Sequence, residues 1–172
     1  PRAELIRDII KKYNEEGRSI LILSDRRGHL DLLYKMLNGY SRGFYVGGMK
    51  PDELRESQEK EIILATFSMA SEGMDIPKLN TVILASPKSD VEQSVGRIFR
   101  EKASVRKFHP LIIDIQDNFS MFQKQSLKRI LFYHKSNFTL FKEGEEILKK
   151  NKKNKKEVEK GKEKIPDFSL ID

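Results

Sequence analysis

The chain has 172 residues, of which 38% are hydrophobic and 34% charged, enough for one domain with a real core. It contains no cysteine, which excludes disulfide frameworks, thiolate zinc sites and cysteine nucleophiles. Its three histidines are isolated, so no metal site is expected. No apolar run is long enough to cross a bilayer and no signal peptide opens the chain, so we expect a soluble, intracellular protein without membrane contact.

The net charge of +7 is concentrated in one short segment. Residues 149–156 contain six lysines and no acid, so the rest of the chain is close to neutral. Two interpretations of this block stay open: nonspecific contacts to nucleic-acid phosphates, or a solvating tail or localisation signal. We expect residues 142–172 to form a charged helix end that continues into a flexible lysine-rich tail.

Hydrophobic periodicity predicts alternating strands and helices over residues 1–141. Apolar residues at helical spacing predict helices over residues 5–13, 28–37, 90–100 and 120–135, and a proline-led acidic turn predicts another from 51. Short apolar runs predict strands over residues 19–24, 44–46, 62–65, 81–85, 111–115 and 138–141. This order is typical of an α/β fold with an open, mainly parallel sheet covered by helices. Such sheets bind ligands at the carboxyl ends of their strands, so residues just after Leu23, Ala65 and Ala85 are candidates.

Residues 93–100 (QSVGRIFR) contain the most informative candidate side chains. On a helix, Gln93, Arg97 and Arg100 share one face, because they are spaced by four and three residues. Two permanently charged guanidiniums beside an amide suit phosphate oxygens. The alternative is a solvated helix face with incidental arginines.

A second candidate segment follows the strand that ends at Ala65. It offers hydroxyls, the first on Thr66, and then Gly73 and Asp75. Hydroxyls and free amides at a strand-to-helix turn suit phosphate oxygens, and a carboxylate two residues past a glycine suits a ribose hydroxyl. The alternative is helix capping by Ser68 and a turn at Gly73.

Together these segments resemble the second RecA-like domain of superfamily 2 helicases, which has a P-loop NTPase-type fold without the P-loop. Gln93–Arg100 matches the Q-x-x-G-R-x-x-R pattern of motif VI, Ala65–Asp75 matches motif V, and Ile20–Arg27 occupies the place of motif IV. The sequences of residues 71–77 and 85–90 are most similar to helicases of large cytoplasmic DNA viruses and some phages, relatives of the excision-repair and type III restriction motors. For a viral protein, the expected locations are the host cytoplasm and the virion.

The resemblance implies roles at the nucleotide. Arg100 would be the arginine finger that reaches the γ-phosphate, with Arg97 beside it. Gln93 would help to arrange the nucleotide and the attacking water. Gly73 and Asp75 would lie by the nucleotide sugar.

The resemblance also implies contacts with a nucleic-acid strand, with DNA expected rather than RNA. Thr66 would touch the backbone, and Arg26, Gly47 and Gly48 fall near family positions that contact the strand. The alternative function is a noncatalytic nucleic-acid-binding scaffold that kept the fold and lost the motor.

Parts of an ATP site are missing from the sequence. Residues 43–48 have the glycine spacing of a P-loop, but Met49 stands where lysine is required. The Asp-Glu pair that holds Mg²⁺ in the family is also absent. The resemblance therefore implies that ATP and Mg²⁺ are bound together with an N-terminal RecA-like domain of the same protein. We expect the 172-residue chain alone to be inactive.

Overall fold

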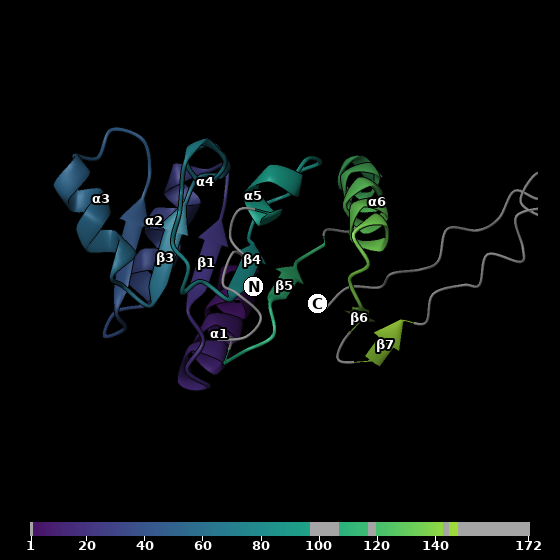
Figure 1. The fold of residues 1–172 in the computed structure, drawn as a ribbon, viewed down its shortest axis with the longest axis horizontal. Helices are drawn as coiled ribbons and strands as arrows, with labels where there is room; N and C mark the ends of the chain where they lie inside the picture. Colours follow the sequence, from purple (N-terminus) through teal and green to yellow (C-terminus); the bar gives the residue numbers. More distant parts are fainter. Residues whose placement is uncertain (1, 97–106, 117–119, 143–144, 148–172) are drawn as a thin grey trace, which may run out of the picture.

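The computed structural model describes residues 2–96, 107–116, 120–142 and 145–147, and its centre is a five-stranded parallel sheet (Figure 1). The strand order is β2-β3-β1-β4-β5, and each strand runs parallel to its neighbours. The strands are β1 (Ile20–Leu23), β2 (Arg42–Tyr45), β3 (Ile62–Ala65), β4 (Thr81–Leu84) and β5 (Leu111–Asp114). The predicted parallel α/β fold is confirmed.

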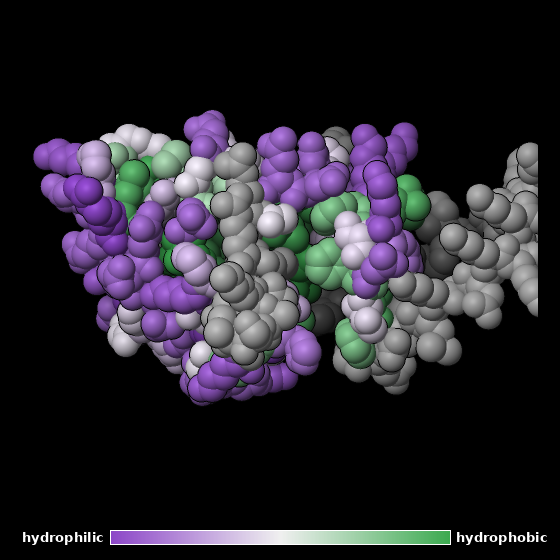
Figure 2. Space-filling view, in the orientation of Figure 1, coloured by the Kyte–Doolittle hydropathy of each residue, from purple (hydrophilic) through white to green (hydrophobic). Residues whose placement is uncertain are grey.

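Helices cover both faces of this sheet. One face carries α1 (Arg2–Glu15) and α2 (Arg27–Met36), and the other carries α4 (Phe67–Glu72), α5 (Glu92–Gly96) and α6 (Ser120–Lys135). At the β2 end of the sheet lies α3 (Pro51–Gln58), and α6 lies beyond β5 at the opposite end (Figure 1). Hydrophilic side chains cover α3, whereas apolar side chains gather beside α6 (Figure 2).

The strands are apolar throughout because both of their faces are buried. Along β1, Ile20 and Ile22 face the core under α1 and α2, whereas Leu21 and Leu23 face the core under α4 and α6. All four are fully buried, as expected for a central parallel strand. No described helix is long and apolar enough to span a membrane.

The chain after α6 differs from the prediction. Leu140–Lys142 (β6) pairs with Glu145–Ile147 (β7) as an antiparallel ribbon separate from the main sheet. The charged helix end expected from residue 142 onward is therefore wrong for residue 142 and for residues 145–147, which are β-strand. Asn137 follows α6 in the left-handed conformation (φ 60°), which ends the helix before β6. Residues 148–172, with the lysine block, lie outside the described residues, and the flexible tail stays a prediction.

Candidate functional site

The residues predicted to contact nucleic acid follow three neighbouring β-strands at the carboxyl edge of the sheet. Gly47 and Gly48 follow β2, Thr66 follows β3 and Arg26 lies after β1. Because the three strands are parallel and in register, their carboxyl ends meet at one edge. Tertiary structure thus brings together positions that are up to 40 residues apart in the sequence.

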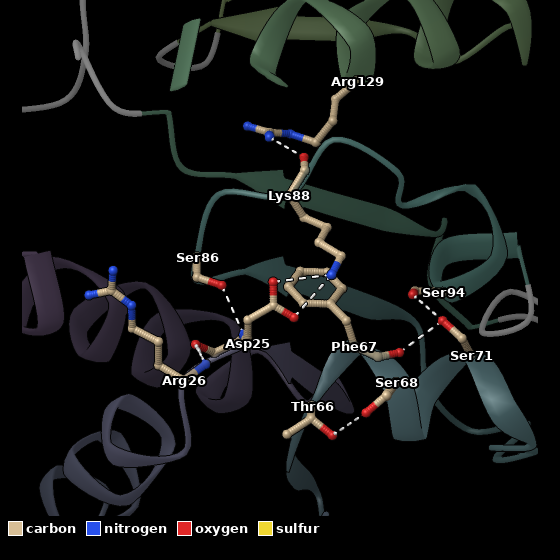
Figure 3. Close-up of polar contacts among 11 residues, drawn as sticks. Asp25, Arg26, Thr66, Phe67, Ser68, Ser71, Ser86, Lys88, Ser94 and Arg129 are labelled. Carbon is tan, nitrogen blue, oxygen red and sulfur yellow. Dashed lines mark hydrogen bonds and ion pairs between the residues drawn. The ribbon is translucent and has the colours of Figure 1, made fainter. Parts of the chain in front are cut away.

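These residues present different chemistry at the edge. Thr66 is half-buried, and its Oγ1 lies 3.2 Å from the Oγ of Ser68. Gly47 and Gly48 are exposed, and Gly48 has a φ of 83°, a conformation that favours glycine. Arg26 is exposed, and its guanidinium is directed away from Thr66 (Figure 3). Backbone and hydroxyl groups therefore face the edge at β2 and β3, and the arginine points elsewhere.

Hydroxyl groups fix the loop after β1. The buried Ser24 accepts a hydrogen bond from the backbone N–H of Arg26 (3.2 Å) through its Oγ, which also lies 3.3 Å from Nδ1 of His29. The backbone N–H of Asp25 donates to Ser86 Oγ (3.0 Å), which ties this loop to the one after β4. Burial, and then the positive charges of Arg2 and Arg26, lower the pKa of His29. The imidazole is therefore expected to be neutral near pH 7.

The predicted nucleotide-contacting residues lie around α4 and α5. Gly73 is the C-cap residue of α4, and both Gly73 and Asp75 are exposed. Gln93 is exposed on the first turn of α5. An amide, a carboxylate and an open glycine backbone suit a ribose and its phosphates, so these residues fit the sugar end of a nucleotide.

A hydroxyl bridge joins the two helices near which these residues lie, α4 and α5. Ser71 Oγ donates to the Phe67 carbonyl (2.8 Å) and lies 2.8 Å from Ser94 Oγ, so Ser94 is the donor between the two hydroxyls (Figure 3). Ser94 is buried and directly follows Gln93. The end of the segment predicted to be motif V is therefore held against the start of the segment predicted to be motif VI. Arg97 and Arg100 lie outside the described residues, so their roles stay predictions.

Lys88, in the loop after β4, is a candidate that the sequence motifs did not indicate. Its Nζ lies 3.2 Å from each carboxylate oxygen of Asp25 and 5.4 Å from the centre of the Phe67 ring (Figure 3). The lysine thus links the loops that follow β1 and β4 to the first residue of α4. Its position three residues after Ala85, at one of the strand ends expected to bind ligands, is the sequence signal that agrees with this.

A buried ion pair packs against this loop, and the sequence motifs did not indicate it either. Arg129 on α6 donates to both carboxylate oxygens of Asp114 at the end of β5, each at 2.8 Å. Its Nη1 donates to the Lys88 carbonyl (2.5 Å), and the Arg129 side chain is only 2% exposed. A lone carboxylate in the apolar run 111–115 could have indicated a buried cationic partner.

Tyr133 completes this network, because its hydroxyl donates to Asp114 (3.0 Å). Burial and the Asp114 charge raise the pKa of Tyr133. Burial alone would lower the pKa of Arg129, but the bonds to Asp114 outweigh it and the net shift is upward. The arginine therefore stays charged, and the network fixes α6 against β5 and the loop after β4.

Comparisons with known proteins identify relatives of this chain. The family described as "Helicase conserved C-terminal domain" matches residues 2–102. "Putative ATP-dependent RNA helicase L396" of Acanthamoeba polyphaga mimivirus is 42% identical over 145 residues, covering 81% of this chain and 28% of that protein. "Putative ATP-dependent RNA helicase QP509L" of African swine fever virus (strain Badajoz 1971 Vero-adapted) is 25% identical over 138 residues, covering 74% of this chain and 27% of that protein.

The fold has counterparts among solved structures. The C-terminal domain of the DEAD-box protein Dbp5 matches with a TM-score of 0.58 at 14% identity, covering 76% of this chain and 78% of that one. The chain spans about a quarter of the length of the two viral relatives. The resemblance stated from the motifs is confirmed: the chain belongs to the helicase conserved C-terminal domain family.

Proposed function

We propose that the chain is the C-terminal motor domain of an ATP-dependent nucleic-acid helicase or translocase. One observation carries this proposal: one candidate residue for the nucleic acid and one for the nucleotide lie at the two ends of one short helix. Thr66 is the N-cap residue of α4, and Gly73 is its C-cap residue. A nucleic-acid strand bound at one end of α4 and a nucleotide bound at the other end would therefore act on the same rigid helix.

The packing of α4 suits such coupling. Phe67 and Ala70 are buried against the sheet, and Ser71 is bonded to Ser94 on α5. Closure of the nucleotide cleft would therefore displace α4 and the strand-contacting edge together. ATP would be the nucleotide, and Mg²⁺ would be held by an N-terminal RecA-like domain of the intact protein.

The identity of the nucleic acid is part of the same proposal. The motif resemblance favours DNA, whereas the names of the two viral relatives describe RNA helicases. A Thr66 hydroxyl and glycine backbone amides recognise phosphates, which both polymers carry. ATPase stimulation by single-stranded DNA and by RNA, measured side by side on the intact protein, decides between them.

The decisive variant is Arg100→Ala in the intact motor. An arginine finger stabilises charge that develops mainly in the transition state, so ATP turnover should fall by roughly a thousandfold or more. Arg100→Lys should recover little activity, because an ammonium keeps the charge but loses the planar fork. Strand affinity, measured by fluorescence anisotropy, should barely change.

Thr66→Ala is the paired control for this experiment. It should weaken strand binding and the stimulation of ATPase by nucleic acid, with basal hydrolysis less affected. Near-normal ATPase combined with lost strand binding in Arg100→Ala would contradict the motor assignment. The noncatalytic scaffold would then be the better explanation.

A further inference from the structure

We propose that Lys88 binds a phosphate of a single nucleic-acid strand, and that Asp25 forms an ion pair with the Lys88 ammonium when no nucleic acid is bound. The inference rests on the proposed function and adds a ligand to it. It starts from the position of Lys88, whose loop follows β4 while its side chain reaches the loop after β1 and the residue after Thr66 (Figure 3). One ammonium therefore lies across the carboxyl ends of β4, β1 and β3, which are neighbours in the sheet.

The surroundings of Lys88 favour a positioned cation over a loose surface side chain. Its backbone carbonyl accepts a hydrogen bond from the buried Arg129, which is itself held by Asp114. Its ammonium lies over the buried Phe67 ring, whose face attracts a cation. Backbone and head group are thus held over Phe67, which directly follows the candidate phosphate contact Thr66 in the sequence.

The ion pair with Asp25 is suited to exchange. The Lys88 and Asp25 side chains are 38% and 45% exposed, and ion pairs this accessible to water are weak. A backbone phosphate can therefore replace the Asp25 carboxylate at the Lys88 ammonium while Asp25 turns to solvent. Asp25 then competes with the strand, because it neutralises the cation and repels phosphate.

This competition predicts opposite effects of two substitutions at one ion pair. Lys88→Met keeps an apolar stem against Phe67 but removes the charge, so it should weaken binding severalfold. The slope of log K against log salt concentration should lose about 0.7 in magnitude for one strand phosphate. Asp25→Asn should tighten binding severalfold, because it frees the ammonium. Most of that gain should vanish in the double variant.

The measurement is anisotropy of labelled oligodeoxythymidine and oligouridine titrated with the 172-residue chain, each variant being checked for cooperative thermal unfolding. The matched controls are Lys78→Met and Glu61→Gln. Their ion pair is similarly exposed, at 33% and 48%, but lies at the amino ends of β3 and β4. These substitutions change the same charges at the opposite edge, so they should leave binding nearly unchanged.

Three results would overturn the inference. Weaker binding in both Lys88→Met and Asp25→Asn would make the pair a structural tie between two loops. If the Lys88 and Asp25 variants changed the affinity only as much as the control variants, the effect would come from net charge alone. If the folded chain bound no nucleic acid, Lys88 would have no strand to contact. None of these results bears on ATP turnover in Arg100→Ala, so the proposed function is tested separately.

Discussion

Gly43 lies in β2 at the edge of the sheet, where its missing side chain lets α3 approach closely. A β-carbon at this position would lie 2.8 Å from Ser57 Oγ and 3.0 Å from both Cα and Cβ of Ser57. Contacts this short cannot be relieved by side-chain rotation alone, because the Ser57 backbone is among them. The glycine spacing that resembles a phosphate loop therefore has a packing cause at Gly43.

Gly43→Ala should destabilise the fold by about 1–3 kcal/mol, because α3 must move away from β2. Gly28→Ala is the control. A β-carbon added to Gly28, which lies in α2, would meet no heavy atom within 4 Å, and alanine favours helices, so its cost should be near zero. Urea denaturation of both variants measures the difference. Equal stability of the two variants would contradict the packing explanation.

At the scale of elements, α6 is attached to the sheet by a charge pair as well as by apolar contacts. Tyr133 is buried, and Phe132 and Phe138 pack against the same core. Arg129 adds bonds to Asp114, Lys88 and Ser126. The helix therefore holds the end of β5 and the loop after β4 at once.

Arg129→Met should destabilise the chain by about 3–5 kcal/mol, because it leaves the Asp114 carboxylate buried without its cation. The control is Arg55→Met, which breaks the exposed pair with Asp52 and should cost at most about 1 kcal/mol. Adding Asp114→Leu to Arg129→Met should recover part of the loss, since no buried charge then remains. Thermal and urea unfolding provide the measurements, and an Arg129→Met cost as small as that of Arg55→Met would contradict a buried structural ion pair.

At the scale of the whole molecule, we propose that the described residues provide one side of a nucleotide site. Gly73, Asp75 and Gln93 suit a sugar and phosphates, and residues 43–49 lack the P-loop lysine. Binding and hydrolysis of ATP would then need the N-terminal domain that we propose as partner. The chain would act as the moving half of a cleft.

The 172-residue chain alone should therefore show no ATP turnover. Phosphate release with saturating single-stranded DNA or RNA is the measurement, and the intact motor is the positive control. Adding the N-terminal domain as a separate chain should restore some turnover if the two halves associate. Clear turnover by the pure chain would mean that the architecture has been misinterpreted.

The sequence by itself determined the parallel sheet and the family to which the chain belongs. Short strands that are apolar on both faces must be buried on both faces, and helical spacing between them leaves few alternatives to an α/β fold. The apolar strand pattern that ends at Ala65 likewise predicted that Thr66 lies at a strand-to-helix turn, and α4 begins directly after it. Family motifs added the candidate roles of Gln93, Gly73 and Asp75.

Only the tertiary structure decided which distant residues meet. Nothing local pairs Lys88 with Asp25, or Arg129 with Asp114, because these contacts depend on strand order and not on sequence spacing. The ribbon of β6 and β7 likewise needs a partner strand before its backbone groups are satisfied, so composition alone suggested a helix end. Burial then decided the difference between the two cations, since Arg129 is buried in an ion pair while Lys88 stays accessible to solvent.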